Sequence, residues 1–183
     1  MFHRNQSRKQ SEHKVQEAGE RGVTFAWTTH SAITDWTAKV DTKAAIVLSL
    51  GSVLLGFFVT LSGKGRILDD MHGWRLILER VGLGWSAIGV VLASLVVAPR
   101  LNRRLTRSSW RENFVYFGHL RYWEPTDLRE KLRSLEVDQE LSVLATQLVA
   151  TSRIAWHKHR LLQGAMVSLI LGTAVVVLSV AWP

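Results

Sequence analysis

The chain is 183 residues long, carries a formal net charge of +8 and is 47% hydrophobic. It contains no cysteine, which excludes disulfides, thiolate catalysis and cysteine-based zinc sites. Its mean hydropathy of +0.08 averages apolar stretches with strongly charged connections, so the pattern along the chain is more informative than the total.

Three stretches of the chain contain no ionisable residue, and each is 18 or 19 residues long. As helices rising about 1.5 Å per residue they would cover roughly 27–28 Å, close to the ~30 Å hydrocarbon core of a bilayer. They lack the alternation typical of barrel strands, and only helices or closed barrels satisfy their own backbone in lipid. The sequence therefore predicts an all-α integral membrane protein with three transmembrane helices. The stretches are Ala44–Leu61, Val81–Ala98 and Gly164–Trp182, the last within a helix expected over 161–182.

Lysine and arginine are concentrated in two of the connecting segments. Residues 1–43 and 99–160 together hold 19 of the 23 basic residues. The positive-inside rule places both segments, and hence the N-terminus, in the cytoplasm, and it places the loop 62–80 and the C-terminus outside. Because no apolar segment precedes residue 44, we expect the first span to be a permanent anchor rather than a signal peptide.

The segments before and after the first span have different expected structures. Residues 1–22 are polar and end with Gly19 and Gly22, which predicts a mobile tail or a frayed helix. Neither glycine nor proline interrupts residues 23–50, so a cytoplasmic helix over 23–43 is expected to continue into the first span. In the loop 62–80 we expect a short helix at the membrane interface, with Trp74 at the level of the headgroups.

The region 99–160 is predicted to form a helical cytoplasmic head. Four arginines follow Pro99 closely and are expected to lie among anionic headgroups. Pro125 is expected to break the region, and an amphipathic helix from Leu128 is expected to continue into the third span. The apolar positions of that pattern are Leu128, Leu132, Leu135, Val137, Leu141, Leu144, Leu148 and Ala155.

Asp41 and Lys43 lie within one helical turn of the expected membrane edge. A carboxylate is costly at this depth unless it is paired. One interpretation is a snorkelling lysine beside an interfacial aspartate. The alternative is that Asp41 forms an ion pair with Arg111 or Lys158, which would hold the head in one arrangement.

The segment from Trp110 to Trp123 interleaves six aromatic residues with basic and amide side chains. Aromatic rings and Arg111 could stack a base and hold a phosphate, and Gly118 would let a ligand approach the backbone. The alternative is that these rings pack the cytoplasmic head and the membrane interface.

Signals for metal binding and for enzymatic catalysis are absent from the sequence. His157 and His159 would point apart on a helix, and no phosphate-binding loop, HExxH motif or nucleophile elbow occurs. The spans carry small residues at helical spacing, which favours close helix packing. The three stretches contain no ionisable side chain, whereas a proton- or ion-coupled transporter normally needs some. Because three spans in one copy leave little room for a water path, any pore is expected to need several copies. The small residues are Ala45, Ser49, Ser52 and Gly56; Ser86, Gly89 and Ala93; and Gly164, Ser168 and Gly172.

The chain resembles the Pycsar transmembrane effectors over roughly residues 24–180. The most specific match is the Asp-Thr-Lys-Ala-Ala motif at residues 41–45, where the first span begins. Weaker matches are Trp27-Thr28, Asp35-Trp36, Phe117-Gly118-His119-Leu120, the helix through Gln139–Leu148, and Ile154, Lys158 and Leu161-Leu162.

This resemblance implies a non-enzymatic antiphage effector of the bacterial inner membrane. In such systems a partner pyrimidine cyclase, activated by infection, makes cyclic CMP or cyclic UMP. The effector senses that nucleotide and damages the membrane, which stops phage growth by abortive infection. The positions that match by motif are Asp41, Lys43, Phe117, Gly118 and Lys158, to which the residue analysis adds Arg111 as a ligand-binding candidate.

Three functional hypotheses follow from the sequence. The first is a ligand-gated, homo-oligomeric membrane effector whose helical head is itself the sensor, because the chain has no strand-rich segment for a cyclic-nucleotide-binding β-roll. Its partners would be the lipid bilayer and the nucleotide, with no cofactor and no nucleic acid. The second is a non-enzymatic membrane scaffold that recruits a soluble protein through its amphipathic helices. The third is a constitutive, holin-like pore.

Overall fold

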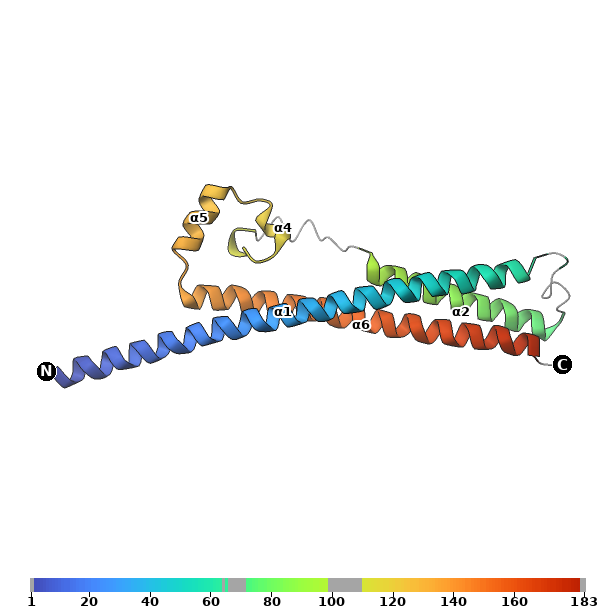
Figure 1. Ribbon diagram of the computed structural model, residues 1–183, viewed down its shortest axis with the longest axis horizontal. Coiled ribbons are helices and arrows are strands. Elements are labelled where there is room, and N and C mark those ends of the chain that lie inside the picture. Colours follow the sequence, from blue (N-terminus) through green and yellow to red (C-terminus); the bar gives the residue numbers. More distant parts are fainter. Residues whose placement is uncertain (1, 64, 66–71, 99–109, 182–183) are drawn as a thin grey trace. The chain divides into compact units, whose positions relative to one another are not determined.

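The computed structural model describes residues 2–63, 65, 72–98 and 110–181, and this part of the chain is helical without any strand (Figure 1). The all-α prediction is therefore confirmed. The helices are α1 (Phe2–Leu61), α2 (Trp74–Val97), the 3-10 turn η1 (Trp110–Glu112), α4 (Phe117–Leu120), α5 (Pro125–Arg133) and α6 (Val137–Ala181).

The chain divides into two compact units, and both draw on α1 and α6. Unit 1 consists of Met1–Asp35 and Arg100–Ile154. Unit 2 consists of Trp36–Pro99 and Ala155–Pro183. Each unit is described separately below.

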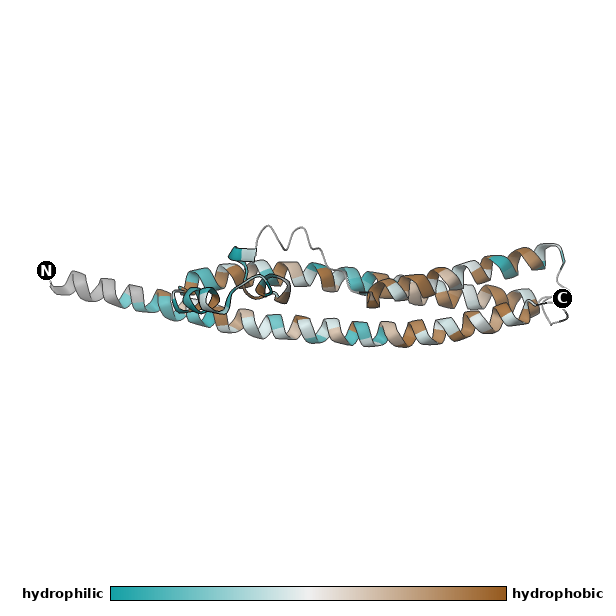
Figure 2. Ribbon diagram, turned by 90° about the horizontal axis from the view of Figure 1, so that it is seen from above, coloured by the Kyte–Doolittle hydropathy of each residue, from teal (hydrophilic) through white to brown (hydrophobic). Residues whose placement is uncertain are grey.

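Unit 2 is a bundle of three helices, formed by α2 and the adjoining parts of α1 and α6. Figure 2 shows hydrophobic residues along all three of these segments. The helices α1, α2 and α6 are long and apolar enough to cross a membrane, which confirms the prediction of three candidate spans. Val40 and Ala44 of α1 pack with Val96 of α2 and Leu162 of α6 in a buried cluster.

The contact between α2 and α6 is unusually close because small residues lie on both sides of it. A Cβ atom added at Gly82 would lie 2.6 Å from Val176 Cγ2 and 2.9 Å from the carbonyl oxygen of Gly172. One added at Gly89 would lie 2.9 Å from the carbonyl oxygen of Ala165. Any side chain at these two glycines would therefore push the helices apart. The small residues predicted for the second span thus serve helix packing.

The small residues predicted for the first span have a different position. Ala45, Ser49, Ser52 and Gly56 are exposed within the chain, whereas Ala44 and Gly51 of the same helix are buried. The packing face of the first span is therefore rotated away from the expected stripe.

Unit 1 joins the first half of α1 to the first part of α6. The Nε1 atom of Trp27 donates a hydrogen bond to Glu140 Oε1 over 3.0 Å, and Ala26, Ile33 and Leu144 are buried. Gly19 lies so close to Val137 that an added Cβ atom would be 2.7 Å from its Cγ1. The glycines that the sequence suggested as the end of a polar tail therefore lie inside a continuous helix, where they permit close packing. The expected mobility of residues 1–22 stays a prediction.

The connection to α6 differs from the single amphipathic helix expected after Pro125. Pro125 occupies the first turn of α5, where its missing N–H group costs nothing. Ser134 then ends α5, and α6 begins at Val137, so the leucine pattern is divided between two helices.

The expected interfacial helix is also replaced, because Trp74 begins α2 itself, directly after Gly73 with its positive φ of 64°. The four arginines after Pro99 and residues 66–71 of the predicted loop lie outside the described residues.

Candidate functional site

A pocket of about 430 Å³ opens within unit 1, between η1, the end of α5 and the first turns of α6. This volume falls within the range of about 300–1,000 Å³ common for small-molecule sites. Its lining combines two cationic side chains, one aromatic ring, one amide and one carboxylate. The lining residues are Arg111, Phe114, Lys131, Leu135, Asp138, Gln139, Ser142 and Val143.

The electrostatics of this pocket suit a small anion that also carries hydrogen-bonding groups. The guanidinium of Arg111 lies 5.1 Å from the centre of the Trp110 ring, which limits its rotation. Lys131 Nζ donates a hydrogen bond to Gln139 Oε1 over 3.2 Å. The first turn of α6 contributes Asp138 and Gln139, and the backbone N–H groups of such a turn favour negative charge.

The aromatic segment beside the pocket packs mainly on itself. The Trp110 and Trp123 rings meet edge to face with centroids 5.2 Å apart, and Trp123 Nε1 donates to the Trp110 carbonyl oxygen over 3.1 Å. Gly118 is buried under the Tyr116 ring, and an added Cβ atom would lie 2.9 Å from Tyr116 Cδ1. These contacts favour the packing interpretation for Gly118. Phe117, by contrast, is 65% exposed and remains free to meet a ligand.

His119 is partly buried in this aromatic turn. Its ring lies edge to face with Tyr116, with centroids 5.4 Å apart. Its Nδ1 atom is buried and has no hydrogen-bond partner in the described part of the chain. Loss of hydration on burial lowers the pKa of His119 below its ordinary value of 6.5. The neutral imidazole is therefore the form that suits this turn.

Asp41 and Lys158 form an ion pair that ties α1 to α6 within unit 2. Lys158 Nζ lies 2.6 Å from Asp41 Oδ1 and 2.7 Å from Oδ2. The lysine side chain is 21% exposed and the aspartate 39%, so the pair is only partly hydrated. Of the two pairings considered for Asp41, the one with Lys158 is confirmed. Lys43 is exposed on α1.

The six ligand-binding candidates from the sequence thus divide between the two units. Arg111, Phe117 and Gly118 belong to unit 1, and of these Arg111 lines the pocket. The remaining three, Asp41, Lys43 and Lys158, belong to unit 2. Contact of any of the six with a nucleotide stays a prediction.

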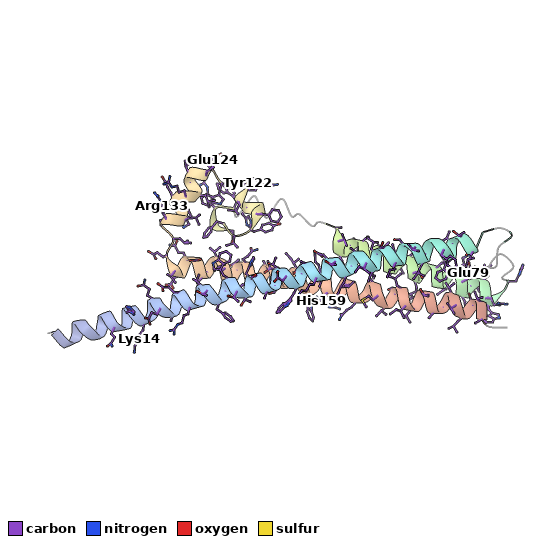
Figure 3. All side chains as sticks on the ribbon, in the orientation of Figure 1. Lys14, Glu79, Tyr122, Glu124, Arg133 and His159 are labelled. Atoms are coloured by element: carbon purple, nitrogen blue, oxygen red, sulfur yellow. The ribbon has the colours of Figure 1, made fainter. Side chains whose placement is uncertain are left out.

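Glu79 is a candidate functional residue that the sequence does not point to directly. It lies on α2 within the unit 2 bundle (Figure 3), it is completely buried, and its Oε1 atom accepts a hydrogen bond from the Ser62 hydroxyl. Its Oε2 atom has no hydrogen-bond partner among the residues that the structure describes. The sequence places Glu79 in the outer loop, because the stretch without ionisable residues begins only at Val81.

A sequence signal for Glu79 nevertheless exists. The buried face of α2 follows a strict alternation of three and four residues, and extending the stripe of Ser86, Gly89 and Ala93 backwards along it reaches Gly82 and then Glu79. Nearby on α2, Arg75 binds the C-terminal end of α6. Its Nε donates to the Ser179 carbonyl oxygen over 3.0 Å, and its Nη2 donates to the Val180 carbonyl oxygen over 3.2 Å. Arg75 thereby caps the last turn of α6.

Comparison with known proteins adds one finding to this geometry. The model of the Pycsar effector protein domain (PycTM) matches residues 25–183, which is most of the chain and contains both the pocket and the bundle. No curated protein and no solved structure gives a significant match. The chain belongs to the Pycsar transmembrane effector family.

Proposed function

We propose that this protein senses a cyclic pyrimidine mononucleotide, cyclic CMP or cyclic UMP, in the unit 1 pocket and then impairs the bacterial inner membrane. Family membership implies a cyclic-nucleotide-triggered antiphage membrane effector, and the family is not known for enzymatic activity. The single observation that carries the sensing step is the pocket lined by Arg111, Phe114 and Gln139.

Each of these side chains offers one element of nucleotide recognition. Arg111 can hold the cyclic phosphate through paired N–H donors, assisted by Lys131 and the first turn of α6. Phe114 can stack on the pyrimidine ring. The amide of Gln139 both donates and accepts hydrogen bonds, which suits the edge of a pyrimidine, and Asp138 can accept a hydrogen bond from the ribose hydroxyl or from an amino group.

The same helix that lines the pocket supplies a path to the membrane segment. Asp138 and Gln139 lie in the first turn of α6, which runs without interruption to Ala181 and carries Lys158 along its length. A ligand that binds one position of α6 better than another shifts the population of that position. The ion pair of Lys158 with Asp41 then carries such a shift from α6 to α1, so the response depends on it.

The membrane arrangement completes the proposal. The N-terminus and the 99–160 segment lie in the cytoplasm, where a partner cyclase releases the nucleotide, and the C-terminus lies outside. Several copies assemble, because three spans in one copy leave little room for a water path.

The test is depolarisation of cells that express the protein, with and without cyclic CMP or cyclic UMP. Arg111→Glu should abolish the response, whereas Arg129→Glu, an equally exposed arginine of α5 outside the pocket, should keep it. Asp41→Ala should also abolish the response but leave nucleotide binding by the purified protein intact. A protein that reaches the membrane but responds to neither nucleotide would instead support the scaffold hypothesis. Depolarisation by expression alone would support the holin-like pore.

A further inference from the structure

Two polar side chains on one face of α2 each bury an oxygen atom that has no hydrogen-bond partner among the described residues. Glu79 is completely buried and Ser86 is 1% exposed. Neither Glu79 Oε2 nor Ser86 Oγ has a hydrogen-bond partner in the part of the chain that the structure describes. The two residues are seven positions apart on the buried face of α2, the same face whose Gly82 and Gly89 meet α6.

This arrangement is costly in a lipid-embedded bundle. A polar group removed from water loses hydration that only an internal hydrogen bond restores, and the loss is largest for a carboxylate. The single donor to Glu79 is the Ser62 hydroxyl. Arg75, four residues before Glu79, donates to carbonyl oxygens of α6 instead, and the adjacent Arg80 is exposed. Water that reached this face would therefore stabilise it.

The reason water is excluded lies between the two residues. Gly82 and Gly172 bring α2 and α6 into such close contact that no side chain fits between them. At Gly82 and Gly172 the contact is van der Waals packing of small residues, and Arg75 adds two hydrogen bonds from α2 to the end of α6. Separation of the helices along this face would break the Arg75 bonds and expose Glu79 and Ser86. We call the face formed by Glu79, Gly82, Ser86 and Gly172 the α2–α6 seam.

We propose that the α2–α6 seam opens on activation and becomes the lining of an aqueous path, and that Glu79 makes this path selective for cations. The inference rests on the proposed function, because it names how the membrane is impaired. Carboxylates at a constriction attract cations and repel anions, and one Glu79 from each copy would form a ring of such charge. The path is then a defined conductor rather than a general disruption of the bilayer.

Cysteine accessibility tests whether water reaches the α2–α6 seam on activation. The native chain has no cysteine, so a single Ser86→Cys variant in proteoliposomes gives no background with a water-soluble thiol reagent. Cyclic CMP or cyclic UMP should raise its labelling rate at least several-fold. The matched control is Ile88→Cys, two residues further on α2 and 50% exposed on another face, which should stay unlabelled. Labelling at Ile88 but not at Ser86 would overturn the seam as the path.

Ion selectivity tests the role of Glu79. Under a potassium chloride gradient, vesicles with the wild-type protein should show a nucleotide-dependent leak that favours potassium over chloride. Glu79→Gln keeps the side chain's size and should lower the potassium-to-chloride permeability ratio several-fold. Glu124→Gln, an exposed glutamate before α5, should leave that ratio unchanged.

The outcomes separate this inference from the proposed function. A nucleotide-dependent leak with unchanged selectivity in Glu79→Gln, or without labelling of Ser86→Cys, overturns the inference and leaves the effector function standing. The absence of any leak from the wild-type protein with either nucleotide overturns both.

Discussion

The two units hold their helices and connecting segments together by different chemistry. In unit 2, small residues pack closely, as Gly82 does against Gly172, and one ion pair links Asp41 to Lys158. In unit 1, large rings pack around Trp110 and Trp123, and a hydrogen bond joins Trp27 to Glu140.

We propose that the difference reflects the surrounding solvent, lipid around unit 2 and water around unit 1. Lipid tails are as apolar as the side chains of a transmembrane helix, so helices in a bilayer associate mainly through close van der Waals contact. In water, burial of large apolar rings drives association directly. The effect of a substitution on stability should therefore depend on the unit in which it lies. An added methyl group is most costly in unit 2, and a lost ring or a gained charge matters most in unit 1.

The largest effect is expected from Gly82→Leu, which places a side chain in the closest helix contact of unit 2. The obstructing atoms include backbone, which cannot rotate away, so we expect a loss of about 3 kcal/mol of stability, at the upper end for overpacking. The matched control is Gly84→Leu, because a Cβ atom at Gly84 meets nothing within 4 Å. Thermal unfolding in detergent, followed by circular dichroism, measures both. Equal Tm values for the two variants would contradict the packing account.

Part of this arrangement could be predicted from the sequence, because hydropathy is a local property. The absence of ionisable residues from Ala44–Leu61 was sufficient to identify a span without knowing what surrounds it. Which face of a helix is buried, by contrast, depends on residues that are remote in the sequence. Gly19 was taken for the end of a tail because its partner, Val137, is remote in the chain.

The candidate site could be predicted only in part for the same reason. The sequence could name Lys158 as one of two possible partners for Asp41, with Arg111, because a carboxylate near the membrane edge needs an opposite charge. The pocket could not be predicted, because it depends on α5 ending at Ser134 and α6 beginning at Val137. The continuous leucine pattern gives no sign of this break between the two helices. The burial of Glu79 could not be predicted, because a charge count assigns a glutamate to a loop, whereas its burial depends on how α2 packs in the bundle.

The second largest effect is expected from breaking the ion pair of unit 2. Asp41→Ala leaves the half-buried ammonium of Lys158 without its partner, and we expect a loss of about 1–3 kcal/mol, between the values for exposed and for buried pairs. The double variant Asp41→Lys with Lys158→Asp should recover much of this loss. A double-mutant cycle on chemical unfolding measures the coupling. If Asp41→Ala is as stable as the native protein, the ion pair between Asp41 and Lys158 does not stabilise unit 2.

A smaller effect is expected from Gly118→Ala in unit 1. The added methyl group meets the Tyr116 ring, and a ring can move aside more easily than backbone can. We expect a loss of about 1 kcal/mol, at the lower end for overpacking, seen as a lower denaturant midpoint of tryptophan fluorescence. The double variant Gly118→Ala with Tyr116→Ala should remove the clash. Persistence of the loss in that double variant would show that Gly118 serves something other than packing.

The smallest effect is expected from pH acting on His119, and it should appear in unit 1 alone. The folded protein holds the pKa of His119 below 6.5, so as pH falls through about 6.5 the unfolded chain takes up the proton first. The stability that the neutral ring contributes is therefore present above that pH and is lost progressively below it. His119→Phe keeps a ring against Tyr116 and should reduce the pH dependence of tryptophan-monitored unfolding. A pH dependence that survives in His119→Phe would place the titrating group elsewhere and return the aromatic turn to a purely apolar role.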